Sequence, residues 1–289
     1  MPVELTQSLL SGLLVGCAFA VLSVGFSLAW GVTHVLNVAH GAFALLAAYL
    51  GYWVASRLGL DPVVALVVIV PLLFGAGVMT YDLLIRITAR RARDLGVSTM
   101  VLTFGLAVVM ENVMQVIWTP DPRVLRTTYT GQAFFVGPIA FPIAQLVAFG
   151  LSVVTIAALF LFMDRTFLGK AVRAVWQDPT GAALCGINLN NVTRITYGIA
   201  VATAGVGGVA MSLLYSFDPA THLVWLVYIF LVVILGGVGS ILGTALAGLV
   251  IGLIIGLTSV FIPLAWGNLV LFTLLIVLLL VRPSGLLQR

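Results

Sequence analysis

Residues 164–194 read DRTFLGKAVRAVWQDPTGAALCGINLNNVTR and form the longest polar interruption in an otherwise apolar chain. This segment carries four basic side chains, at Arg165, Lys170, Arg173 and Arg194. Each of them would cost about 2.5 to 3.5 kcal/mol at the centre of a bilayer, so the segment must lie in water. Because long apolar stretches flank it on both sides, it is a loop between membrane spans. The chain is therefore predicted to be an integral membrane protein.

The same segment has the end signals of two short helices. Residues 169–177 are mostly helix formers. Asp178 can cap a second helix, Pro179 suits its first position, and Gly186 suits the left-handed residue that ends it. We interpret this folded loop as the contact through which a soluble partner drives the membrane domain. The alternative is an ordinary loop that is basic only because its charge orients the chain.

The composition agrees with a membrane protein. Of the 289 residues, 62% are hydrophobic and 8% are charged, whereas soluble proteins have about 25% charged residues. The net charge of +4 comes from basic residues between apolar blocks, so it does not indicate nucleic-acid binding. The two cysteines, Cys17 and Cys185, fall in an apolar block and in the polar loop, and we expect no disulfide. The amino-terminal MPVELTQS lacks the features of a cleaved signal peptide, so the first block is expected to be a retained span.

Apolar stretches approaching the roughly 20 residues that cross a bilayer predict an all-α protein with about nine transmembrane helices, eight to ten allowing for error. They cover residues 8–30, 38–56, 62–81, 97–118, 143–163, 195–216, 223–236, 241–262 and 266–281. We expect one transmembrane domain over residues 1–289, with residues 164–194 as its cytoplasmic coupling loop. The first four and last four spans, separated by the fifth, would run in opposite senses. This arrangement of spans favours an inverted four-helix repeat, with the transport site near the bilayer midplane.

The basic residues predict the orientation. If the carboxyl terminus is cytoplasmic, the inner side receives Arg86, Arg90, Arg91, Arg93, Arg165, Lys170, Arg173, Arg194, Arg282 and Arg289. The outer side then receives Arg57, Arg123 and Arg126. Because basic residues concentrate in cytoplasmic loops, the amino terminus is expected outside and the carboxyl terminus inside. The outer segment 119–142 either lies on the membrane surface, where it could receive an external partner, or is a solvated loop.

Small residues mark close helix contacts. The motif-like spacings are Gly12 and Gly16 in the first span, Gly205, Gly207 and Gly208 in the sixth, and Gly248, Gly252 and Gly256 in the eighth. Such faces let helix backbones approach in lipid. We favour packing within this chain over a seam between subunits.

Two places carry polar residues inside apolar stretches. Residues 30–51, WGVTHVLNVAHGAFALLAAYLG, place Asn37, His40 and Gly41 where a helix breaks and restarts. Broken backbone at membrane depth is tolerated only inside protein or beside a cavity, so these residues either line a translocation path or are packing residues. The fourth span contains Glu111, Asn112 and Gln115. Glu111 and Gln115 share a helix face, and a carboxyl within a span indicates function by default, although it could also bridge to a neighbouring helix.

No motif predicts chemistry within the chain. The turn LGGVGSILG contains Gly236, Gly237, Gly239 and Ser240, but it lacks the lysine of a phosphate loop and is read as a tight cytoplasmic turn. The three histidines and two cysteines are not spaced for a metal, and hydrolase motifs are missing. We expect no catalytic residue, no metal and no bound cofactor.

Three stretches together resemble one family. GVTHVLNVAHGAFALLAAYLG, GKAVRAVWQDPTGAALCGINLNNV and ILGGVGSILGTALAGLVIG resemble, in order and spacing, permease subunits of bacterial ABC importers of branched-chain amino acids. The chain departs from that pattern at Val38, where phenylalanine is common, at Ala42, where an acidic residue is common, and at Glu111, where an uncharged amide is common. These departures bear on which solute is transported more than on whether the chain resembles the family.

The resemblance implies a multi-pass protein of the bacterial inner membrane, working with two cytoplasmic ABC ATPases, a second homologous permease and an extracytoplasmic substrate-binding protein. ATP and Mg would be used by the ATPases. By matching position it assigns Gly169, Arg173, Asp178, Gly186 and Ile187 to the ATPase contact, and Asn37, His40 and Gly41 to the translocation path. Family solutes include branched-chain and other small hydrophobic amino acids, urea, amides and carboxylates. The alternative function is a stand-alone secondary transporter or channel with Glu111 as a proton site, and a membrane-embedded enzyme is a more distant one.

Overall fold

The computed structural model describes residues 2–261 and scattered positions between 266 and 280. Its elements are α1 (Pro2–Thr33), α2 (His40–Leu58), α3 (Pro62–Thr80), the π-helical turn η1 (Tyr81–Ile85), α4 (Arg86–Ala89), α5 (Leu95–Trp118), β1 (Ala133–Val136), β2 (Ile139–Pro142), α6 (Ile143–Arg165), α7 (Phe167–Gln177), α8 (Pro179–Leu184), α9 (Leu189–Leu214), α10 (Thr221–Gly236) and α11 (Ile241–Phe261). Seven of these helical stretches are long and apolar enough to cross a membrane, and the shorter α10 is also apolar. The chain is an all-α integral membrane protein.

The spans predicted before residue 262 each fall on one of these helices, with ends that differ by a few residues. This agreement has a simple cause, because a helix in lipid satisfies its own backbone and its apolar run marks its length. The ninth predicted span, residues 266–281, lies largely outside the described residues.

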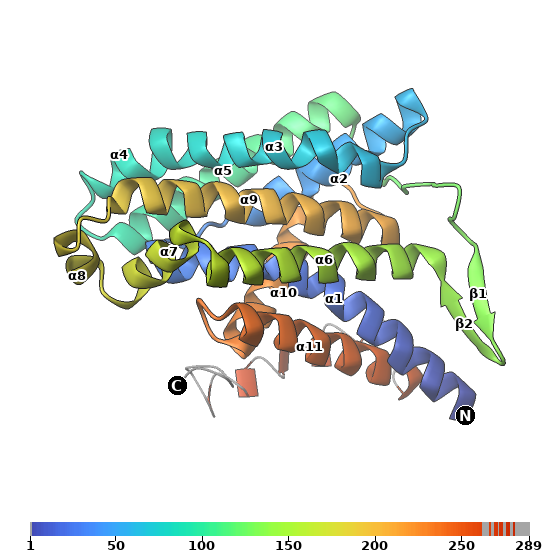
Figure 1. Ribbon diagram of the computed structural model, residues 1–289. Helices are drawn as coiled ribbons and strands as arrows, with labels where there is room; N and C mark the ends of the chain where they lie inside the picture. Colours follow the sequence, from blue (N-terminus) through green and yellow to red (C-terminus); the bar gives the residue numbers. More distant parts are fainter. Residues whose placement is uncertain are drawn as a thin grey trace.

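Helices α1 and α9 lie side by side at the centre of the bundle (Figure 1). Helix α11 packs along α1, and α3 packs along α9. Helix α2 covers α9, and α6 contacts both central helices. Helix α5 lies at the edge, where it contacts mainly α2 and α4. The core is therefore built around α1 and α9, while α5 is held by few neighbours.

The seam between α1 and α11 is made by glycines of both helices. A Cβ on Gly12 would collide with the carbonyl oxygen of Gly252, and a Cβ on Gly16 would lie 2.7 Å from the carbonyl oxygen of Gly248. Backbone therefore packs on backbone along this seam, which in lipid maximises van der Waals contact. The prediction of packing within the chain is confirmed.

Two long helices are each followed by an extended return segment and a helix that starts inside the bundle. After α1, residues 34–39 run back until His40, the first residue of α2, places Nε2 3.2 Å from the carbonyl oxygen of Leu22 in the middle of α1. The predicted break is confirmed. After α9, Phe217 pairs with Arg123 in an antiparallel bridge, and α10 begins at Thr221.

The two short helices of segment 164–194 are also confirmed. Thr166 caps α7 by accepting the Gly169 N–H at 2.9 Å, and Asp178 caps α8 by accepting the Thr180 N–H at 3.0 Å. Gly186 ends α8 with φ of 84°, a left-handed value that favours glycine. At the opposite end of the bundle, β1 and β2 form a projecting hairpin (Figure 1). Its Phe134 and Phe135 are exposed, as either interpretation of the outer segment allows.

Candidate translocation and coupling sites

The amino-terminal ends of α2 and α10 meet inside the bundle. A Cβ on Gly41 would collide with the carbonyl oxygen of His222, so glycine allows the two helix starts to touch. The return segments before them are capped alike, because Asn37 Oδ1 accepts the Ala39 N–H and Asp218 Oδ1 accepts the Ala220 N–H. Both helices direct the positive ends of their dipoles at this junction. The two helix ends therefore form a buried polar site surrounded by apolar side chains.

His40 is fully buried at this junction. Its Nε2 lies 3.2 Å from the Leu22 carbonyl oxygen, which can only accept, so Nε2 carries the proton. The other nitrogen, Nδ1, has no hydrogen-bond partner among the described residues. In the neutral ring Nδ1 is an acceptor, so the junction contains a buried acceptor available to a donor.

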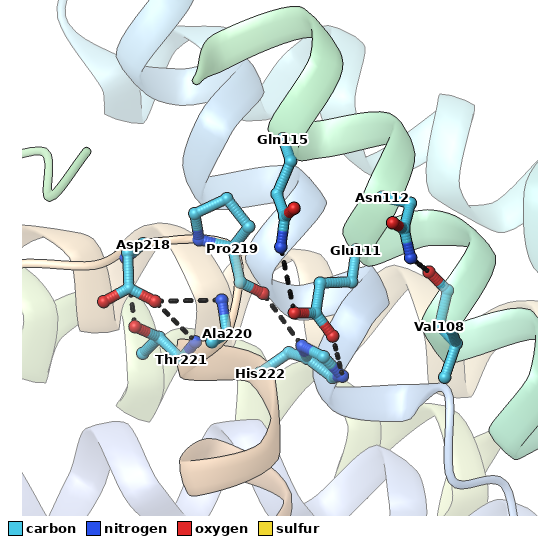
Figure 2. A network of polar contacts seen from close by, with 9 residues as sticks. All are labelled: Val108, Glu111, Asn112, Gln115, Asp218, Pro219, Ala220, Thr221 and His222. Carbon is cyan, nitrogen blue, oxygen red and sulfur yellow. Dashed lines mark hydrogen bonds and ion pairs between the residues drawn. The ribbon is translucent and has the colours of Figure 1, made fainter. Parts of the chain in front are cut away.

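Figure 2 shows a second polar group beside the start of α10, in which α5 contributes Glu111 and Gln115. Gln115 Nε2 donates to Glu111 Oε1 at 3.1 Å, and Glu111 Oε2 lies 3.9 Å from His222 Nε2. His222 Nδ1 lies 2.9 Å from the carbonyl oxygen of Pro219. The side chain of His222 is 1% exposed and that of Glu111 is 20% exposed. The carboxyl is therefore largely shielded and faces the imidazole ring.

The Pro219 carbonyl orients the imidazole ring of His222. Because a carbonyl oxygen accepts, His222 Nδ1 donates to it, and Nε2 is the ring nitrogen that faces Glu111. The carboxyl and the imidazole, which face each other at 3.9 Å, link α5 to the start of α10.

Asn112 lies apart from this group. It is exposed on the outer side of α5, and its Nδ2 donates to the Val108 carbonyl oxygen of its own helix at 2.7 Å. Figure 2 shows its side chain turned away from Glu111 and His222. The structure thus brings Asn37, His40, Gly41 and Glu111 to the region of the helix junction but does not bring Asn112 there.

Sequence reasoning missed the second break and its residues. The stretch 215–222, YSFDPATH, separates two apolar runs and contains an Asp-Pro pair followed by a histidine. Its Asp-x-x-x-His spacing is one residue longer than the Asn-x-x-His spacing of the first break, and this similarity could have identified His222. Thr103 of α5, which contacts the first return segment, had no such signal because it sits within an apolar helix.

The residues predicted for the coupling loop shape and anchor the two short helices. Gly169 is buried against the end of α6, where a Cβ would collide with the Phe162 carbonyl oxygen. Arg173 pairs with Asp164 of α6 at 3.5 Å. Ile187 N–H donates to the Ala182 carbonyl oxygen at 3.0 Å, completing the cap that Gly186 begins. Helix α8 also leaves one large apolar side chain in the open, since Leu184 is 86% exposed.

The glycine turn between α10 and α11 contacts this loop. Gly237 and Gly239 have φ of 88° and 82°, which explains glycine at both positions. Gly239 N–H donates to Ser27 Oγ of α1 at 3.0 Å, and a Cβ on Gly239 would lie 2.8 Å from the Trp176 ring. A mostly apolar cavity of about 220 Å³ lies here, lined in part by Arg173, Trp176, Gly239 and Ser240. Helix α7 therefore contacts α1 and the turn that joins α10 to α11. Gly236 packs against Gly243 across the same turn.

Among the described residues, no three histidine, cysteine, aspartate or glutamate side chains gather as metal ligands would. Long apolar helices around two discontinuous helices that meet inside the bundle define a multi-pass membrane transport domain. The chain belongs to the family described as the permease component of branched-chain amino acid transport systems, which it matches over residues 8–279. It is a permease subunit of the inner membrane, and the predicted resemblance is confirmed.

Similar proteins cover almost the whole chain. It is 26% identical to the high-affinity branched-chain amino acid transport system permease protein BraD of Pseudomonas aeruginosa, over 98% of this chain and 95% of BraD. Identity to the LivH permease protein of Escherichia coli K12 is also 26%, over 98% of this chain and 95% of LivH. A probable LivH of Methanocaldococcus jannaschii is 24% identical, over 92% of this chain and 87% of that protein. No solved structure matches the chain.

Proposed function

We propose that the chain forms the membrane path of an ATP-driven importer for branched-chain or related small hydrophobic amino acids. The relatives are named for transport of branched-chain amino acids, and they align with nearly the full chain. The proposed partners are two ABC ATPases, a second homologous permease and an external substrate-binding protein, within membrane lipid. The ATPases would use ATP and Mg, and this chain would bind no cofactor.

The proposed topology has about nine spans, an outer amino terminus and an inner carboxyl terminus, which puts the α7–α8 end in the cytoplasm. An inverted repeat is supported by matching contacts. Helices α1, α2 and α3 would correspond to α9, α10 and α11, since α1 packs on α11 as α9 packs on α3. Both units also place an extended return segment after their first helix.

The junction of α2 and α10 carries the proposed path. Many transporters bind solute near the bilayer midplane, at the amino-terminal ends of discontinuous helices. The positive dipole ends and free N–H groups of these helices face an anionic group of the solute. An amino acid would present its carboxylate to these helix ends and its ammonium to Glu111. Asn37, His40 and Gly41 belong to this path, and Asn112 is proposed for it only through its position beside Glu111.

Hydrolysis in the ATPases would move α7 and α8 as one lever. Replacing Arg173 or Asp178 by alanine is expected to lower amino-acid-stimulated ATPase activity while the permease still inserts. Asp178→Ala removes a helix cap worth about 1 kcal/mol, and Arg173→Ala removes the pair with Asp164. ATPase assays on the reconstituted complex measure the effect. Normal stimulation in both variants would contradict the assignment of this loop.

Uptake by proteoliposomes tests the function. The complete complex is expected to accumulate labelled leucine only when two conditions are met. ATP must be enclosed in the vesicle, where the ATPases can hydrolyse it, and the substrate-binding protein must be present outside. The permease alone, given a proton gradient, is expected to accumulate none. Gradient-driven uptake by the permease alone would instead establish the stand-alone secondary transporter.

Replacing Glu111 by glutamine is expected to reduce uptake by about tenfold or more, because glutamine lacks the negative charge proposed to bind the ammonium group of the solute, and a hydrogen bond to a charged group is worth about 1.5 to 3 kcal/mol. Asp121→Asn is the matched control, since Asp121 is an exposed carboxylate just after α5. Initial uptake rates in proteoliposomes measure both. Full transport by Glu111→Gln would remove Glu111 from the path and leave it a bridge between α5 and α10.

A further inference from the structure

Helix α5 reaches the return segment before α2 and the start of α10 through one row of side chains. Thr103, Ala107 and Glu111 follow each other at i, i+4 and i+8, so they lie along one face. Thr103 and Ala107 are fully buried. Glu111 contacts His222 at the start of α10, and Thr103 contacts the segment before α2. Helix α5, at the edge of the bundle, therefore contacts both sides of the junction between α2 and α10.

The hydroxyl of Thr103 makes the hydrogen bonds to the return segment before α2. Val38 N–H donates to Thr103 Oγ1 at 3.0 Å. The hydroxyl has one hydrogen to donate, and three carbonyl oxygens lie within its reach, those of Leu36 at 3.1 Å, Thr99 at 2.8 Å and Met100 at 3.2 Å. The bond accepted from Val38 does not depend on which of them receives that hydrogen. Residues 34–37 have no helix or strand to hold their backbone. Lipid cannot replace a lost partner at this depth, so the hydroxyl fixes the local path of the chain.

We propose that Thr103 is a positioning residue for transport, whose hydroxyl holds residues 34–39 and so sets the start of α2 at its junction with α10. This inference rests on the proposed passage of solute at that junction. Thr103 does not touch the solute. It acts through Val38 and Leu36, and without its hydroxyl the segment gains alternative positions, which weakens solute binding before it slows turnover.

Three substitutions isolate the hydroxyl. Thr103→Val keeps the shape of the side chain and removes the oxygen, whereas Thr103→Ser keeps the oxygen. Thr99→Val is the matched control, because Thr99 is also fully buried on α5 and, within the described part of the chain, its hydroxyl bonds only to the Leu95 and Gly96 carbonyl oxygens of its own helix. Thr103→Ala replaces Thr103→Val if the latter does not assemble into the complex.

The first measurement reports the position of the segment without using transport. The assembled complex carries Val38→Cys, with Cys17 and Cys185 replaced by alanine and serine, and a water-soluble thiol reagent labels it. Val38 is 7% exposed, so labelling of the parent protein is expected to be slow. Thr103→Val is expected to speed labelling about tenfold, the effect of losing about one hydrogen bond. Thr103→Ser and Thr99→Val are expected to leave the rate within about twofold. Equal rates in Thr103→Val and Thr99→Val would overturn the proposal.

The second measurement connects this position to transport in a cysteine-intact background. In leucine uptake, Thr103→Val is expected to raise KM about tenfold with a smaller change in maximal rate, and Thr103→Ser is expected to restore KM. Faster labelling with an unchanged KM would overturn the transport role of Thr103. If the wild-type complex takes up no amino acid with ATP, the proposed function fails, and the labelling contrast still decides whether the hydroxyl positions the segment.

Discussion

Replacing Gly252 by leucine is expected to destabilise the protein more than any other single change considered for the membrane core. Gly252 packs directly on the backbone of Gly12 and Gly16 in the seam between α11 and α1. A leucine cannot find room by rotating, because the atoms it meets are backbone of a helix. Overpacking in a well-packed interior costs about 1 to 3 kcal/mol and occasionally more, and a backbone clash places this variant at or above the upper end.

The expected result is a lower midpoint of thermal unfolding in detergent and loss of the monodisperse peak in size-exclusion chromatography. Gly150→Leu in α6 is the matched control, because a Cβ at Gly150 meets no atom of the described residues within 4 Å. That variant is expected to behave like the parent protein. If leucine at 252 were as well tolerated as leucine at 150, the close seam between α1 and α11 would be wrong.

Replacing Leu184 by aspartate is expected to break the contact through which the permease stimulates the proposed ATPases. Leu184 ends α8 and is 86% exposed, although the residues around it are held by the Asp178 and Gly186 caps. A rigidly presented apolar side chain is suited to a pocket on the proposed ATPase, and a buried anchor of this kind typically contributes about 2 kcal/mol or more. Amino-acid-stimulated ATPase activity and uptake are both expected to fall more than about tenfold.

Two controls separate the contact from the fold. Leu184→Met keeps volume and apolar character and is expected to retain coupling. Leu58→Asp introduces the same charge at a leucine that is 62% exposed at the carboxyl end of α2, and it is expected to leave coupling intact. Thermal stability of the isolated permease should be unchanged by Leu184→Asp. Coupled uptake at the parental rate in Leu184→Asp would show that α8 does not meet the ATPase through this side chain.

Several features were predictable because their causes are local. The spans follow from apolar runs, since a helix in lipid needs no neighbour to satisfy its backbone. The helices of segment 164–194 follow from Asp178, Pro179 and Gly186, whose preferences act within one turn. The break at Asn37 to Gly41 was visible for the same reason. The family was recognisable from the order and spacing of three such stretches.

Other features depend on which helices meet. The sequence placed Glu111 and Asn112 side by side in one span, but only the packing of α5 on α2 and the start of α10 turns Glu111 inward and leaves Asn112 outside. Neither the pairing of His222 with Glu111 nor the hydroxyl contact of Thr103 has a local signal, since their partners lie 111 and 65 residues away.

The sequence by itself determined that this is a helical membrane protein of the permease family, with a capped polar loop and a broken helix. The tertiary structure alone decided that a second broken helix meets the first, and that Gly41 is there to let them touch. The physical reason is that hydropathy and capping act along the chain over a few residues. Close approach of two helix ends depends on the shape of all the helices packed around them, and no short stretch encodes it.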